Sequence, residues 1–562
     1  MPEYGPQTQA GQAIFAQKYA QQGETFRDAC NRVASGLKDS AAHYHEFRSI
    51  LLDQRFLPGG RIMASIGTSK NTCSHNCFVS GVVEDSFVDG PGSIMDRAKE
   101  AAATMRMGGG IGYDFSGLRP RGALIKKLNS NASGPVSFMH IFDAVCLATC
   151  SSGHRRGAQM GVLRVDHPDI EEFVHAKANR DRLTGFNISV AVTDAFMDAV
   201  DAGASEFPLV FGGQFHRSIN PGHLWEAIMR SAWDWAEPGV LFIDRMNIEN
   251  NLNYCETIAA TNPCSEQPLP PYGACLLGSF NLVKYMKRHE PGPWFFDYTQ
   301  LYADVAPVIR AMDNVNDLAR YPLPEQHAEA LAKRRMGIGV TGLANAIEAM
   351  GYAYGSKEFL GTMHTILFSL ADASYRASAM LAAEKGPFPL FEREPYLASP
   401  YIKRLPDFVR ALIEKHGIRN SHLISMAPTG TISLCADNVS SGIEPVFAKR
   451  LTNTINTLSG VEKVEVIDYG FRVFDTEPRT ADQVTAEEHV AVLCCAQKYT
   501  DSAVSKTCNV PPTMEWDAFK ALYHRAWRRG AKSCAVFNTG GKRAGVLEAV
   551  ADTDCVSGMC GI

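Results

Sequence analysis

The run Asn187-Ile188-Ser189-Val190-Ala191-Val192 is short and apolar, as expected of a buried strand. Comparable runs occupy residues 209–211, 239–243 and 535–537. Segments with apolar residues at helical spacing separate these runs, and we predict helices over residues 11–37, 90–107, 133–151 and 363–385. Strands that alternate with helices predict an α/β fold with a mostly parallel sheet.

The composition is that of a globular protein with a large core. The chain has 562 residues, of which 45% are hydrophobic and 20% are charged. The net charge of −5 makes duplex nucleic acid a poor candidate partner, and small phosphorylated ligands held by a local site fit better. The sequence shows no secretory signal and no apolar run of about 18 residues that would span a membrane.

Fifteen cysteines without an export signal indicate a reducing compartment, and we expect a cytoplasmic protein. Most of the thiols are then buried small hydrophobes, metal ligands or redox catalysts. No repeat or low-complexity linker divides the chain. We therefore expect a helical region over residues 1–50, one catalytic domain over 51–547 and a mobile tail over 548–562.

The segment Asn262-Pro263-Cys264-Ser265-Glu266 is the first candidate for chemistry. Its Asn, Cys and Glu stand at positions i, i+2 and i+4, which places the three side chains on one face of an extended or loop segment. A thiol between a carboxylate and a carboxamide can abstract a hydrogen atom, exchange protons and hold a hydroxyl group. The alternative is a loop with one buried cysteine.

Three further cysteine segments are ambiguous on their own. The segment 273–282 predicts that Cys275 is a buried thiol of the core. Cys73, His75 and Cys77 have the spacing of half a zinc site, but no second ligand pair completes it. Cys555 and Cys560 lie in a tail that offers no core to pack into, so they are either a mobile dithiol or an adventitious pair.

Two glycine-containing segments could bind phosphate groups. Residues 427–433 (Ala-Pro-Thr-Gly-Thr-Ile-Ser) form a turn rich in hydroxyls before a helix, which suits a phosphate as well as it suits an ordinary helix start. Residues 337–342 match the dinucleotide pattern GxGxxG, but Lys333-Arg334-Arg335-Met336 stands where an apolar strand should precede it. Nicotinamide binding is therefore only a remote alternative.

From about residue 47 onward, the chain resembles the catalytic chain of ribonucleotide reductases. The resemblance rests on an ordered set of short segments, each weak alone. They are residues 56–61 (FLPGGR), 76–79 (NCFV), 108–112 (GGGIG), 155–158 (RRGA), 165–170 (VDHPDI), 262–266 (NPCSE), 335–342 (RMGIGVTG), 428–431 (PTGT), 442–445 (GIEP) and the tail.

The resemblance implies a ten-stranded α/β barrel, made of two antiparallel-arranged halves of five parallel strands, with a central finger loop that carries a radical cysteine. It implies that Cys264 is that cysteine and that Asn262 and Glu266 are its partners. Cys77 and Cys275 resemble the pair that is oxidised to a disulfide as the substrate is reduced. Cys555 and Cys560 resemble the tail pair that restores it, with electrons from a thioredoxin-like reductant.

The implied reaction uses these residues in sequence. A thiyl radical at Cys264 takes the 3′ hydrogen of the ribose, Glu266 accepts the 3′-OH proton while the 2′-OH leaves as water, and Asn262 holds the sugar. The substrate-binding residues implied by the resemblance are Asn76, Gly109, Gly110, Pro428, Thr429, Gly430, Thr431 and Ser433. The sequence leaves open whether the substrate is a diphosphate or a triphosphate.

Members of the family differ in how they make the radical. Those that receive it from a separate metalloprotein subunit have adjacent tyrosines where this chain has Ala535 and Val536, and neither of these residues can relay a radical. The segment typical of glycyl-radical members is absent from the sequence. Exclusion and similarity therefore favour the adenosylcobalamin-dependent type (class II), although no cobalamin-binding motif is visible. A reductase with a separate radical subunit is the main alternative.

The resemblance also implies regulation. Asp85, Ser86, Arg119 and Lys126 resemble residues of the nucleotide effector site that sets substrate specificity, and Arg156 resembles the loop that couples effector to substrate. The alternative for Arg119 and Lys126 is a solvated face. We expect no overall on/off ATP module, because the core segments begin by residue 56. A homodimer is expected, because this effector site usually lies at a subunit contact.

Overall fold

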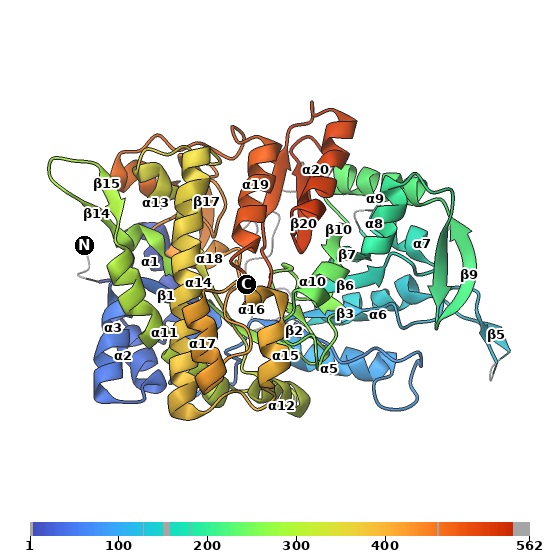
Figure 1. Cartoon of the computed structure of the whole chain (residues 1–562), viewed down its shortest axis with the longest axis horizontal. Helices are drawn as coiled ribbons and strands as arrows, with labels where there is room; N and C mark the ends of the chain where they lie inside the picture. The colour runs from blue at the N-terminus through green and yellow to red at the C-terminus, as the bar shows by residue number, and fades with distance from the viewer. Residues whose placement is uncertain (1–3, 127–128, 150–157, 180, 458–459, 543–562) are drawn as a thin grey trace.

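The structure is a computed structural model that describes residues 4–126, 129–149, 158–179, 181–457 and 460–542. Its centre is a ten-stranded, mostly parallel sheet with helices around it, which confirms the predicted α/β class (Figure 1). The path of hydrogen-bonded strands is β1-β13-β2-β3-β6-β7-β10-β20-β19, and β16 pairs with β13.

The first half of the sheet consists of five parallel strands, in which each strand pairs with the next along the chain. These strands are β2 (Cys77–Val79), β3 (Gly110–Asp114), β6 (Gln159–Arg164), β7 (Phe186–Val192) and β10 (Gly239–Phe242). The helices that connect or follow them are α5 (Ile94–Arg106), α6 (Pro135–Ala148), α7 (Ile170–Val174), α8 (Asp194–Asp201), α9 (Pro221–Trp235) and α10 (Ile243–Ile248).

The second half is less continuous. Its named strands form two parallel pairs, β13 (Ala274–Asn281) with β16 (Met336–Thr341) and β19 (Thr507–Val510) with β20 (Ser533–Asn538). Between the two pairs lie only isolated parallel bridges, Ile338 with Ile424 and Met426 with Val504. The named strands do not form a closed hydrogen-bonded ring.

The two halves meet in antiparallel fashion at β2–β13 and at β10–β20, and β1 (Phe56–Pro58) adds an antiparallel strand beyond β13. The helices of the second half are η2 (Leu282–Tyr285), α11 (Tyr298–Leu318), α12 (Pro324–Lys333), α13 (Leu343–Ala349), α14 (Lys357–Lys385), α15 (Arg393–Ala398), α16 (Pro400–Lys403), α17 (Asp407–His416), α18 (Gly430–Cys435), η3 (Gly470–Phe474), α19 (Ala486–Gln497) and α20 (Trp516–Arg528). In Figure 1 the long helices α11, α14 and α17 of the second half lie on the opposite side of the molecule from α6–α9, whereas α20 of the second half lies beside α9.

The core explains why the predicted strands are apolar on both faces. Val190 and Val192 belong to the large cluster under the helices, whereas their neighbour Ala191 belongs to a small inner cluster. Side chains alternate between the faces of a strand, so a sheet covered on both sides needs apolar residues throughout. The inner cluster also holds Cys77 and Cys275, which places both thiols on the enclosed face of the sheet.

The helix predicted over residues 11–37 is wrong as a single element. The chain forms α1 (Gln9–Ile14), the π-helix η1 (Phe15–Tyr19) and, after a break, α2 (Phe26–Leu37). A new helix begins because Thr25 and Asp28 make a reciprocal capping box. The helices α3 (Ala41–Leu52) and α4 (Gly60–Ser65) follow.

The other predicted elements exist with shifted ends. Helix α5 begins at Ile94, because Ser93 caps it, and α14 begins at Lys357, before the predicted start at 363. The run at 209–211 lies in β8 (Phe207–Phe211), but this strand pairs only with β9 (Gln214–Ile219) in a hairpin outside the main sheet. Other hairpins are β4 (Leu124–Ile125) with β5 (Ser130–Asn131), β14 (Met286–Arg288) with β15 (Trp294–Phe296), and β17 (Arg450–Thr457) with β18 (Gly460–Ile467).

A search of the described helices for a membrane-spanning segment found none that combines sufficient length with sufficient apolarity.

Candidate active site

A narrow hairpin carries the segment 262–267 to the enclosed face of the sheet. Its strands are β11 (Ala260–Thr261) and β12 (Pro268–Leu269), and the turn between them includes Ser265 in a left-handed conformation (φ 65°). The hairpin lies against β3 so closely that a Cβ atom on Gly112 would be 1.8 Å from the carbonyl oxygen of Thr261. We call residues 260–269 the finger and residues 262–267 its tip.

Both halves of the sheet hold the tip. From the first half, Asn187 Nδ2 donates a hydrogen bond to the carbonyl oxygen of Pro263 (3.0 Å). From the second half, the backbone N–H of Ala503 and the hydroxyl of Ser425 both donate to the carbonyl oxygen of Glu266 (3.0 Å each). The tip is therefore fixed at the centre of the molecule.

The tip brings the predicted catalytic side chains together around Cys77. Asn262 Nδ2 donates to Cys77 Sγ over 3.2 Å, and the Cys77 thiol faces Glu266 Oε1 at 3.7 Å. Cys264 lies in the same tip and keeps 6% of its surface exposed, whereas Cys77 and Cys275 are fully buried. Asn262 and Glu266 are also fully buried.

Burial shifts the proton equilibria of this site. It raises the pKa of Glu266 to about 7, while hydrogen bonds from Asn262 and Cys77 act in the opposite direction. The pKa values of the Cys77 and Cys275 thiols are raised well above the ordinary value, again chiefly because of burial. At neutral pH the site therefore holds two protonated thiols and a carboxyl group that can take up or release a proton.

Cys77 and Cys275 lie directly opposite each other where the two halves meet. They are Cα partners in the antiparallel pair β2–β13, and both are free thiols in the structure. Directly opposed residues of an antiparallel pair have Cα atoms about 4.5–5.5 Å apart, within the range that a disulfide spans. The strand register thus permits this pair to close a disulfide without a large backbone movement.

A pocket adjoins the tip and includes several predicted substrate residues. Its lining residues are Gly59, Gly60, Asn76, Glu266, Leu277, Gly278, Ser279, Ala427, Pro428, Thr429, Gly430 and Ile432. Thr431 and Ser433 are not among them, and the Ser433 hydroxyl donates to the carbonyl oxygen of Gly430 (3.0 Å). Gly109 and Gly110 also lie outside the lining, although a Cβ on Gly110 would meet Pro263 at 3.1 Å.

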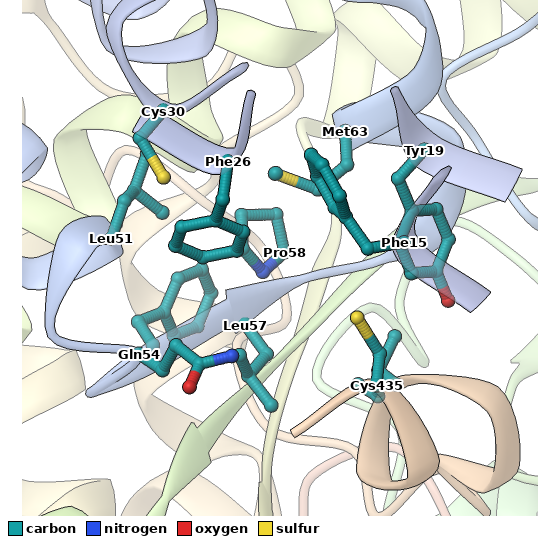
Figure 2. A pocket seen from close by; sticks show the side chains of 12 residues that line it. Phe15, Tyr19, Phe26, Cys30, Leu51, Gln54, Leu57, Pro58, Met63 and Cys435 are labelled. Carbon is teal, nitrogen blue, oxygen red and sulfur yellow. The ribbon is translucent and has the colours of Figure 1, made fainter. Parts of the chain in front are cut away.

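A second cavity lies behind this pocket, between the N-terminal helices and α18 (Figure 2). Ile432 lines both cavities. The wall is almost entirely apolar, and Gln54 contributes a buried side-chain nitrogen with no hydrogen-bond partner among the described residues. The N-terminal helices thus support α18, and α18 begins with the residues of the predicted phosphate loop.

Two of the predicted effector residues form an ion pair near the first half of the sheet. Arg119 Nε lies 2.7 Å from Asp85 Oδ2, and the backbone N–H of Arg119 donates to Asp85 Oδ1 (3.1 Å). Ser86 accepts a hydrogen bond from the N–H of Asp89 (3.1 Å), and Lys126 is exposed beside β4. Arg156, Cys555 and Cys560 lie outside the described residues.

The geometry does not favour the zinc alternative. Cys73 Sγ accepts a hydrogen bond from the N–H of His75 (3.3 Å), while the His75 ring faces Asn316 (3.4 Å) and Cys77 faces the finger. Within the part of the chain that the structure describes, no group of three or more metal-ligating side chains is placed to hold an ion. The GxGxxG match does not follow a strand: its first five residues lie within strand β16, and Gly342 comes directly after it.

Sequence reasoning missed several residues of this site. Asn187 was recognised only as part of a strand, and Gly59, Gly60 and Ser279 only as parts of longer motifs. Their contribution depends on contacts between distant segments, such as Asn187 with Pro263, for which the sequence pattern contains no signal.

The comparisons with known proteins agree with this geometry. The sequence matches the family described as "Ribonucleotide reductase, barrel domain" over residues 75–467 and 471–537. The chain therefore belongs to the ribonucleotide reductase family.

Its relatives include several proteins named vitamin B12-dependent ribonucleoside-diphosphate reductase. The one from Mycobacterium tuberculosis (strain CDC 1551 / Oshkosh) is 34% identical, with 92% of this chain and 76% of the relative covered. The one from Thermoplasma acidophilum is 32% identical, with 91% and 67% covered. A vitamin B12-dependent ribonucleotide reductase from Streptomyces coelicolor is 29% identical, with 92% and 60% covered.

Proposed function

We propose that this chain reduces ribonucleotides to 2′-deoxyribonucleotides by thiyl-radical chemistry that depends on adenosylcobalamin. The observation that carries the proposal is the finger tip, which presents Cys264, Asn262 and Glu266 beside the opposed thiols Cys77 and Cys275. The names of the relatives support the cobalamin dependence and favour ribonucleoside diphosphates as substrates.

The residues divide the reaction among them. Cys264 as a thiyl radical takes the hydrogen from C3′ and returns it at the end, so it is regenerated. Glu266, with its pKa raised to about 7 by burial, takes the proton of the 3′-OH as the 2′-OH leaves as water. Cys77 and Cys275 supply two electrons and two protons and become a disulfide, so that one ribonucleotide and two thiols give one deoxyribonucleotide, one disulfide and one water.

Two observations bear on whether this site suits adenosylcobalamin. On β20, Ala535 and Val536 provide no side chain that could relay a radical to the site from another protein. Of the three thiols, only Cys264 keeps any exposed surface, and its neighbour Ser265 is half-buried. These two residues form the edge of the tip that would meet the cofactor, which when bound supplies a radical beside Cys264.

The loop 428–433 and the face around Asp85 complete the proposal. Pro428, Thr429 and Gly430 share a pocket with Glu266, which supports a role for this loop in binding the substrate phosphates. The Asp85–Arg119 pair supports an effector nucleotide site on the first half. Regeneration of the disulfide through Cys555 and Cys560, by a thioredoxin-like reductant, is part of the proposal.

We further propose a homodimer through the face next to Asp85. Large apolar side chains are exposed there on the loop before α5 and on α5. They are Val82, Phe87, Val88 and Met95, with exposed fractions of 41–61%. Such a group is characteristic of a protein interface. No disulfide joins two of the described cysteines, which supports a reducing compartment, and we propose the cytoplasm.

The test is cofactor dependence. Purified chain with a ribonucleoside diphosphate, a deoxynucleotide effector and a small dithiol is expected to be inactive alone and to form product when adenosylcobalamin is added, without a second protein. Cys264→Ser is the matched control: it is nearly isosteric, but its O–H bond is too strong to give the radical, so no product is expected. If adenosylcobalamin has no effect and a metal-containing partner protein restores activity, the cobalamin assignment is wrong.

A further inference from the structure

The segment 337–342, which matches the dinucleotide pattern GxGxxG, packs against the predicted phosphate loop and the residues that precede it. It forms strand β16, every residue of which is buried, and then turns at Gly342 (φ 73°) into α13. The strand lies so close to the residues preceding the loop that a Cβ on Gly339 would be 2.4 Å from the carbonyl oxygen of Ser425. The glycine pattern therefore reflects close backbone packing against the base of the loop.

The loop itself contains a residue in an unfavourable conformation. Thr429 has φ 56°, a left-handed geometry that is rare for a β-branched residue. Such a conformation persists only where surrounding contacts enforce it. The contacts here are the backbone N–H of Gly442, which donates to Thr429 Oγ1 (2.6 Å), and Thr341 Oγ1, which lies 3.0 Å from Thr429 Oγ1.

The directions of these hydrogen bonds follow from counting protons. The Thr341 hydroxyl donates its single proton to the carbonyl oxygen of Ser440 (3.1 Å). The 3.0 Å contact between the two threonines therefore requires Thr429 to donate to Thr341. The single proton of the Thr429 hydroxyl is then used inside the protein, and the same oxygen accepts from the N–H of Gly442, so this side chain anchors the loop.

Asn345 holds Ser440, whose carbonyl oxygen accepts the hydrogen bond from Thr341. Its Oδ1 accepts from the N–H of Ser440 (2.6 Å), and its Nδ2 donates to both carboxylate oxygens of Asp468 (3.2 and 3.0 Å). The N–H of Gly342 also donates to the carbonyl oxygen of Ser440 (2.7 Å). A buried network thus runs from Asp468 through Asn345, Ser440 and Thr341 to Thr429.

We propose that Thr341 and Asn345 are positioning residues for the substrate-phosphate loop 428–433, an inference that rests on the proposed function of that loop. Neither residue belongs to the lining of the pocket, and both are fully buried. They act by holding Thr429 in its left-handed conformation, which sets the shape of the loop. Binding energy from the phosphate groups then depends on a hydroxyl and an amide that lie outside the lining of the pocket.

The experiment compares two ligands, a ribonucleoside diphosphate and the same ribonucleoside without phosphate, by equilibrium dialysis with the full chain. Thr341→Val keeps the side-chain shape and removes the hydroxyl. It is expected to weaken diphosphate binding roughly tenfold, while nucleoside binding stays within about twofold, because only phosphate contacts depend on the loop. Thr341→Ser restores the hydroxyl and should restore diphosphate binding. In turnover, Thr341→Val should raise KM while kcat is largely kept.

Two further variants complete the experiment, one as a stability control and one as a milder substitution in the same network. Ser231→Ala removes a buried hydroxyl in the first half whose single proton lies within hydrogen-bond distance of two carbonyl oxygens, those of Val174 (3.0 Å) and Glu237 (2.9 Å). This variant should lose similar stability without any change in KM. Ser440→Ala removes only the acceptor for the N–H of Asn345 (3.3 Å) and is the milder variant if Thr341→Val does not fold. It should weaken diphosphate binding about twofold to threefold.

The outcomes separate this inference from the proposed function. If Thr341→Val and Ser440→Ala weaken both ligands alike, or neither ligand, the positioning role is wrong although the wild-type chain is an active reductase. If the wild-type chain reduces no ribonucleotide with adenosylcobalamin, the proposed function itself fails. Loss of diphosphate binding alone, with rescue by Thr341→Ser, supports the inference.

Discussion

The two halves of the sheet are built differently. In the first half, five strands pair in chain order with continuous parallel ladders, whereas the second half contains isolated bridges at Ile424 and Val504. Where the second ladder is interrupted, the backbone N–H groups of Leu423 and Ile424 donate to the carboxylate of Asp501 (2.7 and 3.0 Å). Backbone hydrogen bonds to the neighbouring segments continue as far as Met426, and the loop 428–433 follows shortly after it.

This difference in backbone structure matches a difference in the functions that we propose for the two halves. The regular half carries the proposed effector residues on its connecting segments, and the irregular half provides the proposed substrate loop. The finger lies between them and is bonded to both, through Asn187 on one side and Ala503 on the other. The predictions below test this division, beginning at the junction of the halves.

The largest effect on repeated turnover is expected from the tail cysteines. Cys77 in the first half and Cys275 in the second are fully buried at the junction, so a protein reductant cannot reach them directly. We expect Cys555→Ser or Cys560→Ser to stop after the first turnovers with thioredoxin and to recover with a small dithiol. Product formed per enzyme is the measurement. Cys255→Ser, at an exposed thiol, is the control, and normal thioredoxin-driven turnover in the tail variants would show that the tail pair is not needed.

The contact between the finger and the first half should be almost as sensitive. A Cβ at position 112 would lie 1.8 Å from the Thr261 carbonyl oxygen, so Gly112→Ala must displace the finger. We expect the free energy of unfolding to fall by about 1–3 kcal/mol, as at other overpacked sites, and we expect kcat to fall as well.

Gly361→Ala is the matched control for this variant. Gly361 lies within α14, and among the described residues no atom outside the adjacent backbone of this helix lies within 4 Å of a Cβ placed there. Alanine should therefore stabilise the helix by up to about 1 kcal/mol. Urea unfolding of both variants measures the difference, and equal stability of Gly112→Ala and wild type would contradict the close packing of the finger.

The regular half was also the more predictable one. Strands β7 and β10 were recognised because a sheet buried on both faces leaves uninterrupted apolar runs in the sequence. In the second half only residues 535–537 were recognised as a strand. β16 is broken up by glycines, which match a dinucleotide motif, and residues 422–426 contain His and Ser. Their pairing depends on partners far along the chain.

The site shows the same limit. The spacing of Asn262, Cys264 and Glu266 predicted that they share a face, because neighbours in a short segment cannot lie far apart. Nothing local in the sequence brings Cys77 to Glu266, which is 189 residues away, and that link came only from the family resemblance. The network from Thr341 to Thr429 had no signal at all, because hydroxyl pairs leave no periodic pattern.

We expect the burial of Glu266 between the two halves to lower the free energy of unfolding by an amount that depends on pH. Its folded-state pKa is about 7 and its ordinary value is 4.5, so between these pH values the folded chain holds a proton that the unfolded chain has lost. Stability therefore falls as pH rises from about 4.5 to 7, by up to about 3 kcal/mol. Glu266→Gln should be inactive but more stable than wild type at pH 8, with an advantage that shrinks toward pH 5.

Thermal unfolding at both pH values measures this effect, and a pH-independent difference would contradict it. The wild-type enzyme should show the matching limb in its activity. Because Glu266 must be ionised to accept a proton, kcat/KM should rise with pH through about 7.

The smallest effect on the fold is expected at Arg119, on the first half. Its ion pair with Asp85 is about one-third exposed on both sides, and exposed pairs contribute at most about 1 kcal/mol, so Arg119→Ala should unfold almost as wild type does. It should nevertheless lose the change in substrate preference that a deoxynucleotide effector causes, while KM without effector stays unchanged. Thr341→Val, on the second half, should raise KM with or without effector. Relative rates with the four ribonucleotides, measured with and without each effector, distinguish the two patterns.

Arg121→Ala is the control, because Arg121 is an exposed neighbour paired with Glu172 (2.6 Å) that has no proposed role. A full effector response in Arg119→Ala, or its loss in Arg121→Ala, would mean that the effector site lies elsewhere and that the halves do not divide their functions in this way.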